Sequence, residues 1–284
     1  MVEPSLLSEI TDRFTSLSDT PALDASVLLA QILNKPRAWV MAHPEVTLTA
    51  GQQKQLDEAL ARLDRGESFP YVLGHWEFVG LDFDITPEVL IPRPETEFLV
   101  ERAIGWLRES PVRRTVADVG TGSGAIAISI AVHVPDAKVL ATDISENALE
   151  VAKTNAKKFD VAQRIDFVPC DLLPPKPGSF ATEQQLDLIC ANLPYIPTDT
   201  LRDLPIYGRE PTLALDGGDD GLALIRRLLR VAPEWLAPNG MMLLEIESTR
   251  GIEALHLARE LFSPATIQLH KDLAGQDRLL EIHF

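Results

Sequence analysis

The sequence predicts an α/β fold, in which an open, mostly parallel sheet with helices on both faces follows a small helical bundle and a β-hairpin linker. Beyond Arg114, short runs of Val, Ile and Ala alternate with helical patterns, which is typical of doubly wound parallel sheets. Before Gly66 the patterns are helical only. A chain of 284 residues is long enough for two modest domains. We therefore expect a helical domain at 1–68, a hairpin and linker at 69–92, and an α/β domain at 93–284.

Two helix starts are readable in the first domain. Thr20 is a candidate N-cap before Pro21, and the apolar face that follows comprises Leu23, Val27, Leu28 and Ile32. Thr49 has the capping-box spacing to Gln52. The apolar positions of this second helix are Leu56, Ala59, Leu60 and Leu63. Gly66 is expected to end it.

The linker is predicted to be a hairpin followed by a stiff segment. Residues 71–78 and 81–85 are aromatic and alternating, with Gly80 between them, which is typical of two paired strands. Two prolines in the next segment exclude a helix until Pro94. Helical spacing then extends over residues 95–107.

The α/β domain is expected to end in an antiparallel pair. The earlier strand candidates are 115–119, 138–142, 165–168, 186–191 and 241–246. The last two candidates, 265–269 and 278–282, flank the turn-rich residues 272–277, which are few enough to join antiparallel neighbours.

Composition narrows the classes of partner. The net charge of −16 and the pI near 4.8 oppose a wide phosphate-binding face, so we expect no direct contact with nucleic acid. Cys170 and Cys190 have neither CxxC spacing nor clustered His partners, so we expect reduced core cysteines and no metal site. The N-terminus lacks the pattern of a signal peptide, and no apolar run approaches membrane-spanning length. We expect a cytoplasmic protein that does not bind membranes.

A glycine-rich turn follows the first strand of the α/β domain. Residues 118–124 read Asp-Val-Gly-Thr-Gly-Ser-Gly and open an apolar helix at 125–132. Glycines let the backbone approach a ligand and present amide donors at the start of a helix. The residues predicted to surround a cofactor are Gly120, Thr121, Gly122, Ser123 and Gly124. The same turn also fits the looser dinucleotide pattern G-x-G-x-x-A, and tight packing of helix on strand is a further alternative.

Two more strand ends carry acidic residues. Asp143 ends the second strand, where a carboxylate at the carboxyl edge of the sheet can accept both ribose hydroxyls. Asp171 and Leu172 follow the third strand, where the carboxylate can accept from an adenine amino group and a backbone N–H can meet the ring. Alternatively, Asp171 caps a turn before Pro174. These positions predict a nucleoside cofactor, and an acidic rim suits one that bears a sulfonium.

The fourth strand is followed by Asn192-Leu193-Pro194-Tyr195, which we interpret as the active site. An Asn side-chain oxygen and a neighbouring backbone carbonyl can each accept one hydrogen of an NH2 group, while a Tyr ring stacks on the planar group that carries it. The alternative is an Asx turn followed by an aromatic core residue. The segment therefore predicts that a planar amino group is held for methylation.

Longer motifs resemble one family over nearly the whole chain, the peptide chain release factor glutamine N5-methyltransferases of the PrmC/HemK group. The most specific are Ile91-Pro92-Arg93-Pro94-Glu95-Thr96-Glu97 and, further on, Glu210-Pro211, Ala214-Leu215-Asp216-Gly217-Gly218 and Asp220-Gly221-Leu222. The resemblance implies a Rossmann-like, seven-stranded class I methyltransferase domain. It also implies S-adenosylmethionine as donor, S-adenosylhomocysteine as product, the Gly-Gly-Gln glutamine of release factors as substrate, and an N-terminal domain that helps to hold that protein.

By this resemblance, the glycine turn surrounds the methionine part of the donor, Asp143 takes the ribose, and Asp171 with Leu172 takes the adenine. Asn192 is also expected among the residues that contact the donor. The residues that would hold the glutamine amide are Asn192, Leu193, Pro194 and Tyr195. Arg93, Glu95 and Thr96 would shape the pocket or serve the structure alone. We expect a monomer.

Leu193 departs from the family, which usually reads Asn-Pro-Pro-Tyr. We expect function to survive, because this position acts through its backbone carbonyl and Pro194 still favours an extended conformation before it. Asn-Leu-Pro-Tyr is also the form associated with ribosomal RNA adenine dimethyltransferases, so an N6-adenine RNA methyltransferase is the alternative function. The acidic charge and the longer motifs oppose it. Glu247 and Arg250 depart as well, where the family has Gly and Gln.

Two other classes of function explain less. A dinucleotide-dependent oxidoreductase would account for the glycine turn and leave Asn192 to Tyr195 unexplained. A binding module that has lost catalysis is disfavoured by intact Asp143 and Asn192.

Overall fold

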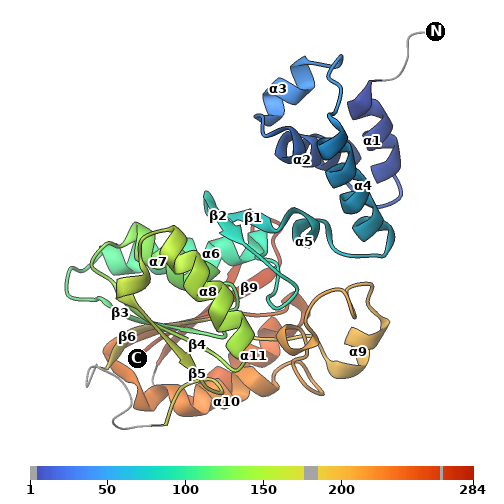
Figure 1. The fold of residues 1–284 in the computed structure, drawn as a ribbon. Coiled ribbons are helices and arrows are strands. Elements are labelled where there is room, and N and C mark those ends of the chain that lie inside the picture. Colours follow the sequence, from blue (N-terminus) through green and yellow to red (C-terminus); the bar gives the residue numbers. More distant parts are fainter. Residues whose placement is uncertain (1–4, 176–184, 263–264) are drawn as a thin grey trace. The chain divides into compact units, whose positions relative to one another are not determined.

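The computed structural model describes residues 5–175, 185–262 and 265–284 (Figure 1). The chain forms two compact units, Met1–His75 and Trp76–Phe284. The division lies within the segment predicted to link the two domains. Among the helices of the described residues, none has the length and apolar character that a membrane crossing requires.

The first unit is helical, as predicted. Its helices are α1 (Leu6–Phe14), α2 (Pro21–Leu33), α3 (Arg37–Ala42), α4 (Ala50–Asp64) and α5 (Phe69–Leu73). The capping box at the start of α4 is confirmed, because Thr49 accepts from the Gln52 backbone and the Gln52 side chain accepts from the Thr49 backbone. Leu56, Ala59, Leu60 and Leu63 are all buried. At α2 the prediction is less accurate: Thr20 makes no side-chain cap bond, and Leu23 is exposed.

The predicted strand at 71–78 is wrong in its first half, which belongs to helix α5. Pro70 lies in the first turn of this helix, where its missing N–H costs nothing. Gly74 ends the helix in the left-handed conformation, with a φ of 80°. The aromatic run therefore gains a helical turn that buries Tyr71, Val72 and Leu73 together.

The hairpin itself is confirmed, with strands β1 (His75–Phe78) and β2 (Leu81–Asp84). Both central turn residues have positive φ, 51° at Val79 and 71° at Gly80, as a tight two-residue hairpin requires. The Val79 N–H donates to Glu97 Oε1 at 2.9 Å, which holds this unfavourable conformation for a β-branched residue.

The sheet of the second unit has the order β5-β4-β3-β6-β7-β9-β8. Its strands are β3 (Thr115–Val119), β4 (Lys138–Asp143), β5 (Ile165–Pro169), β6 (Leu186–Ala191), β7 (Leu236–Glu245), β8 (Thr266–Lys271) and β9 (Asp277–His283). Strands β3 to β7 are parallel, and β8 pairs antiparallel with β9, as predicted. Strand β9 also pairs antiparallel with β7. Strand β7 begins at Leu236, earlier than the predicted start at Met241.

Helices cover both faces of this sheet. Helices α6 (Pro94–Arg108), α7 (Ala125–His133) and α8 (Glu146–Lys158) lie on one face, and α10 (Ala223–Val231) and α11 (Gly251–Leu261) lie on the other (Figure 1). Short elements complete the unit: α9 (Thr198–Asp203), η1 (Ala162–Arg164), η2 (Thr212–Ala214), η3 (Ala232–Glu234) and η4 (Ser248–Arg250).

The direction of winding changes at β3, which lies between β4 and β6. In open α/β sheets, the carboxyl ends of the strands at such a switch point leave a crevice in which ligands bind. The glycine turn after β3 and the Asn192 segment after β6 therefore lie at the same edge of the sheet.

Candidate active site

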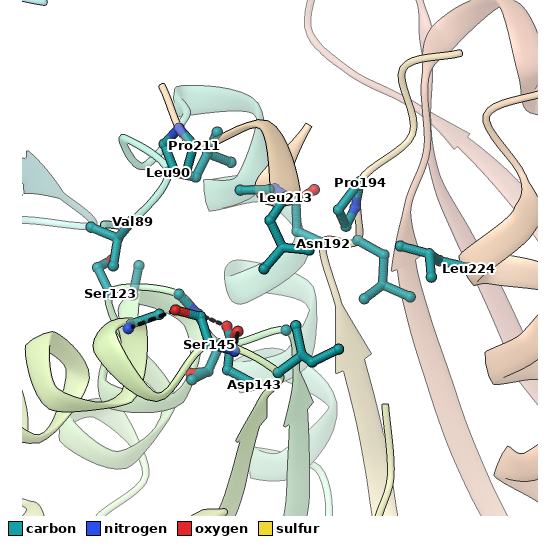
Figure 2. A pocket seen from close by; sticks show the side chains of 18 of the residues that line it. Val89, Leu90, Ser123, Asp143, Ser145, Asn192, Pro194, Pro211, Leu213 and Leu224 are labelled. Carbon is teal, nitrogen blue, oxygen red and sulfur yellow. Dashed lines mark hydrogen bonds between the residues drawn. The ribbon is translucent and has the colours of Figure 1, made fainter. Parts of the chain in front are cut away.

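A cavity of about 720 Å³ lies at the carboxyl ends of the parallel strands. Figure 2 shows Asp143, Asn192 and Leu213 among its lining side chains. Most of the predicted site residues line it: Gly120, Thr121, Gly122, Ser123, Asp143, Asp171, Leu172, Asn192, Leu193 and Pro194. Two predicted residues do not appear in this lining, Gly124 and Tyr195. Tyr195 lines a smaller cavity of about 160 Å³ that shares Asn192, Leu193 and Pro194 with the larger one.

The glycine turn is anchored to the neighbouring strand. The backbone N–H groups of Gly120 and Thr121 both donate to the Thr142 carbonyl, at 2.9 and 2.8 Å. Gly122 has a φ of 55°, and apart from its two chain neighbours no residue of the described chain has a heavy atom within 4 Å of where its Cβ would be. The turn therefore leaves open space on its cavity side, where a ligand can approach the backbone.

Gly124 serves packing behind the turn. It has a φ of 83° and begins helix α7. A Cβ at this position would lie 2.7 Å from Ile128 Cδ1 and 3.2 Å from the Ala152 side chain. The absence of a side chain at Gly124 thus lets α7 approach α8. The sequence motif alone does not show which of its glycines serve packing and which serve contact with a ligand.

Asp143 is held at the cavity by backbone donors. Its Oδ2 accepts from the Gly122 N–H at 2.9 Å, and its Oδ1 accepts from the Ser145 N–H at 2.9 Å (Figure 2). Burial raises the pKa of this carboxyl, against the lowering effect of these backbone donors. A carboxylate has about four acceptor positions, so Asp143 can still accept a hydrogen bond from a ligand.

Asp171 lies at the cavity in an ion pair. Its Oδ2 lies 2.5 Å from Arg227 Nη2, and both side chains are about half exposed. Leu172 has a φ of 64°, which is unusual for a leucine, and its carbonyl accepts from Thr142 Oγ1 at 2.6 Å. The pairing with Arg227 was not predicted, since α10 lies far from Asp171 in the sequence.

Asp118 is a buried acid beneath the glycine turn. Its Oδ2 accepts from Thr121 Oγ1 at 2.6 Å and from the Ala127 N–H at 3.0 Å, which ties the end of β3 to α7. Its Oδ1 has no hydrogen-bond partner in the described part of the chain. Complete burial raises the pKa of Asp118 to about 7.

The Asn192 segment is held by partners that the sequence patterns did not connect to it. Asn192 Nδ2 donates to Thr96 Oγ1 at 2.9 Å, and Thr96 Oγ1 donates to Glu245 Oε2 at 2.6 Å. The Tyr195 hydroxyl donates to Glu245 Oε1 at 3.4 Å. Thr96 is in α6 and Glu245 ends β7, so only the folded chain brings them together. Burial raises the pKa of Glu245 to about 7.

Two glycines of the 210–222 stretch lie directly on the backbone of this segment. A Cβ at Gly217 would lie 2.7 Å from Tyr195 Cα and 2.8 Å from the Pro194 carbonyl oxygen. A Cβ at Gly221 would lie 2.3 Å from the Tyr195 carbonyl oxygen. Two backbone hydrogen bonds also join Ile196 to this stretch. The Ile196 N–H donates to the Leu215 carbonyl, and the Ile196 carbonyl accepts from the Gly217 N–H.

The described residues contain no group of three or more His, Cys, Asp or Glu that could hold a metal ion. Cavity residues that sequence reasoning did not assign include Phe78, Glu88, Val89, Leu90, Leu213 and Leu224. Several of these residues lie in or next to the hairpin, the linker motif and the Glu-Pro motif. Their place in or beside these motifs was the only sequence signal that could have assigned them to the site.

Comparison with known proteins gives consistent matches. Residues 5–74 match the family described as PrmC N-terminal domain, and residues 116–204 match the family described as Methyltransferase domain. A Moorella thermoacetica protein named release factor glutamine methyltransferase is 43% identical over 261 residues, which cover 92% of this chain and 90% of that protein. A Coxiella burnetii protein of the same name is 38% identical over 274 residues, with 95% of each chain covered.

Solved structures support the fold. The hMettl16 catalytic domain matches with a TM-score of 0.53 and 16% sequence identity, and the match covers 82% of each chain. At this identity the likeness concerns the fold alone.

Proposed function

The chain belongs to the release factor glutamine methyltransferase family, and from this premise we propose that it methylates the side-chain amide nitrogen, N5, of the glutamine in the Gly-Gly-Gln loop of peptide chain release factors. The donor is S-adenosylmethionine, and the product is S-adenosylhomocysteine. One observation carries the proposal: Asn192 and its neighbours share a cavity with the glycine turn and Asp143.

The cavity fits the donor in shape and in chemistry. When bound, S-adenosylmethionine supplies a methyl group on a positively charged sulfonium. Asp143 keeps lone pairs for the ribose hydroxyls, and the open space at Gly122 leaves room for the methionine part. Asp171 and Leu172 remain our assignment for the adenine. The charged residues that line the cavity are four acids, Glu88, Asp143, Asp171 and Asp216, and two arginines, Arg93 and Arg227. The excess of negative charge favours a cationic ligand.

Asn192 and Leu193 are assigned to the glutamine amide. Asn192 Oδ1 and the Leu193 carbonyl would each accept one amide hydrogen, and Tyr195 would support the planar group. An amide nitrogen is a weak nucleophile, because its lone pair is delocalised into the carbonyl. Two fixed acceptors favour pyramidal character at that nitrogen and hold it in line with the methyl group, so catalysis is positioning and electrostatics.

The proton balance requires no general base at the start. The glutamine nitrogen forms the new N–C bond as the bond from the methyl carbon to the sulfonium sulfur breaks, and the electron pair of the broken bond remains on sulfur. The resulting N-protonated methylamide is acidic enough to lose its extra proton to water. The residues around Asn192 therefore need only hold, orient and partly desolvate the amide.

The helical unit is assigned to the protein substrate. We propose that the predicted domain at 1–68 helps to hold the release factor, and that the protein acts as a cytoplasmic monomer without direct contact to nucleic acid. The match of residues 5–74 to the PrmC N-terminal domain family supports this assignment.

A transfer assay tests the substrate. The purified full chain is incubated with methyl-labelled S-adenosylmethionine and a release factor, its loop Gln→Ala variant, or bare ribosomal RNA. Label on the release factor that disappears in the variant would support the proposal. Label on RNA alone would establish the adenine methyltransferase alternative and refute the proposal.

A further inference from the structure

Asn192 begins a continuous line of hydrogen bonds that ends on a buried carboxylate. Asn192 Nδ2 donates to Thr96 Oγ1, and Thr96 donates to Glu245 Oε2. The other oxygen of Glu245 accepts from the Tyr195 hydroxyl. Thr96 is 4% exposed and Glu245 is 1% exposed, so this line has little access to water. In such surroundings the direction of each hydrogen bond is set by the available protons.

The proton count decides which way the Asn192 amide faces. A threonine hydroxyl has one proton, and that of Thr96 is given to Glu245. The Thr96 oxygen can therefore only accept from Asn192, and the amide must turn its NH2 group toward Thr96. The opposite orientation would set two lone pairs against each other. Asn192 Oδ1 is consequently directed away from Thr96.

We propose that Glu245 is a positioning residue which, acting through Thr96, fixes the Asn192 amide so that its oxygen is presented to the amino group being methylated. This inference rests on the proposed function. Glu245 itself would touch neither the glutamine nor the donor, since it does not line the larger cavity. Its ionised form supplies the acceptor that orders the whole line.

Protonation of Glu245 would exchange donor and acceptor in the two hydrogen bonds that join Glu245 to Thr96 and Thr96 to Asn192. Tyr195 already donates to Oε1, so the new proton would lie on Oε2 and point at Thr96. The Thr96 hydroxyl would then donate to Asn192 Oδ1, and Asn192 would present its NH2 group to the NH2 group of the substrate. Two donors facing each other form no hydrogen bond, so the neutral form of Glu245 removes one acceptor from the site.

The surroundings of Glu245 place this change near neutral pH. Burial is the main cause that raises its pKa to about 7, and Glu95 on α6 raises it further. Arg278 on β9 lowers the pKa, as do the hydrogen bonds from Thr96 and Tyr195. Arg278 is shared with Asp272, at 3.2 Å, so it does not fully compensate for burial.

Glu245→Gln is the central variant. With Tyr195 donating to the Gln carbonyl oxygen, the Gln NH2 group faces Thr96 and imitates neutral Glu245. We expect kcat on the release factor to fall at least about tenfold, with donor Kd changed less than about threefold. In the unmodified protein, kcat should rise between about pH 6 and pH 8, and the Gln variant should lack this rise.

Three further variants separate positioning from structure. Thr96→Val removes the hydroxyl and should lower kcat as Glu245→Gln does, whereas Thr96→Ser keeps the hydroxyl and should restore kcat to within about threefold. Glu281→Gln is the matched control, because Glu281 is another carboxylate that is 1% exposed in the same sheet. It should leave the pH dependence of kcat unchanged.

The outcomes are distinguishable. A Glu245→Gln variant with unchanged kcat and an unchanged pH profile overturns the inference, as does a Thr96→Ser variant as inactive as Thr96→Val. Loss of donor binding in Glu245→Gln would also overturn it. If the unmodified chain binds donor and does not methylate the release factor, the proposed function fails instead.

Discussion

Glu210 accepts two hydrogen bonds from the segment that leads into α6, one from the Ile91 N–H at 3.1 Å and one from Arg93 Nη2 at 2.6 Å. The Glu210 side chain is 4% exposed and that of Arg93 is 28% exposed. The pair joins the linker motif at 91–97 to the Glu-Pro stretch at 210–222. Residues of both segments line the cavity that Asn192 also lines, so the ion pair joins two parts of the cavity wall.

Arg93→Met should destabilise the protein by about 2 kcal/mol, because it leaves a buried carboxylate with a single backbone donor; partial exposure of Arg93 reduces the loss expected for a fully buried pair. Denaturant unfolding measures the change. Arg202→Met is the control, since its pair with Asp199 is exposed and should contribute less than about 0.5 kcal/mol. Equal losses in the two variants would contradict the buried role of Arg93.

Gly217→Ala should lower methyl transfer by at least about tenfold, because the new methyl group would displace the Pro194 and Tyr195 backbone. Donor binding should change little, since Gly217 does not line the larger cavity. Titration calorimetry and the transfer assay measure the two quantities. Gly105→Ala is the matched control: it lies within α6 with open space around it, and should stabilise the helix by about 0.5–1 kcal/mol. Retained activity in Gly217→Ala would show that the loop does not support the site.

The architecture was predictable because each of its signals is local. A capping box, Gly or Pro at chain reversals, and short runs of Val, Ile and Ala are each patterns of a few residues. The apolar runs identified every strand of the larger sheet. The segment at 69–73 failed, since aromatic residues are common both in strands and in short buried helices. There, Pro70 and Gly74 were the more reliable signals.

The candidate site was predictable only at its strand ends. Asp143 and Asn192 each follow a parallel strand, and topology alone places such residues at one edge. Thr96 and Glu245 lie 149 residues apart, and no sequence motif includes both residues. Their contact arises from packing of α6 against the end of β7, which no local signal encodes.

Asn192→Ala should abolish methyl transfer, with a loss of at least about 100-fold, because it removes one of the two proposed acceptors for the amide hydrogens. Donor affinity should stay within about threefold, since Asp143 and the glycine turn are unchanged. The converse variant, Asp143→Ala, removes the acceptor of the Gly122 and Ser145 N–H groups and should weaken donor binding at least about tenfold. If Asn192→Ala lost donor binding as Asp143→Ala does, Asn192 would belong to the donor site.

Asp118→Asn should remove a pH dependence of stability. Burial raises the pKa of folded Asp118 to about 7, above its value in the unfolded chain, so the folded protein holds this proton more tightly. The associated stability is present below the unfolded pKa and is lost as pH rises through the folded pKa. The free energy of unfolding of the unmodified protein, minus that of the variant, should therefore fall between about pH 4 and pH 7, by at most about 1.4 kcal/mol per unit. A difference that stays constant over this range would show that Asp118 is ionised in the fold.

The side chain of Leu193 packs against the glycine turn and so connects that turn to the proposed amide site. This role is separate from the proposed role of the Leu193 carbonyl as an acceptor. The side chain is 4% exposed, and its Cδ2 lies 3.1 Å from where a Cβ of Gly120 would be. Leu193→Ala should leave a gap beside Gly120, lower stability by about 2–3 kcal/mol and weaken donor binding as well as turnover. Leu193→Pro keeps the carbonyl and much of the apolar volume, and it stiffens the backbone before Pro194.

Leu193→Pro should therefore retain turnover within about threefold, while Leu193→Ala should not. Unfolding curves and single-turnover transfer distinguish the effects, because a purely structural loss lowers stability and leaves the rate of donor-saturated enzyme unchanged. If Leu193→Pro is folded and inactive, the backbone of the segment requires a conformation that proline cannot adopt.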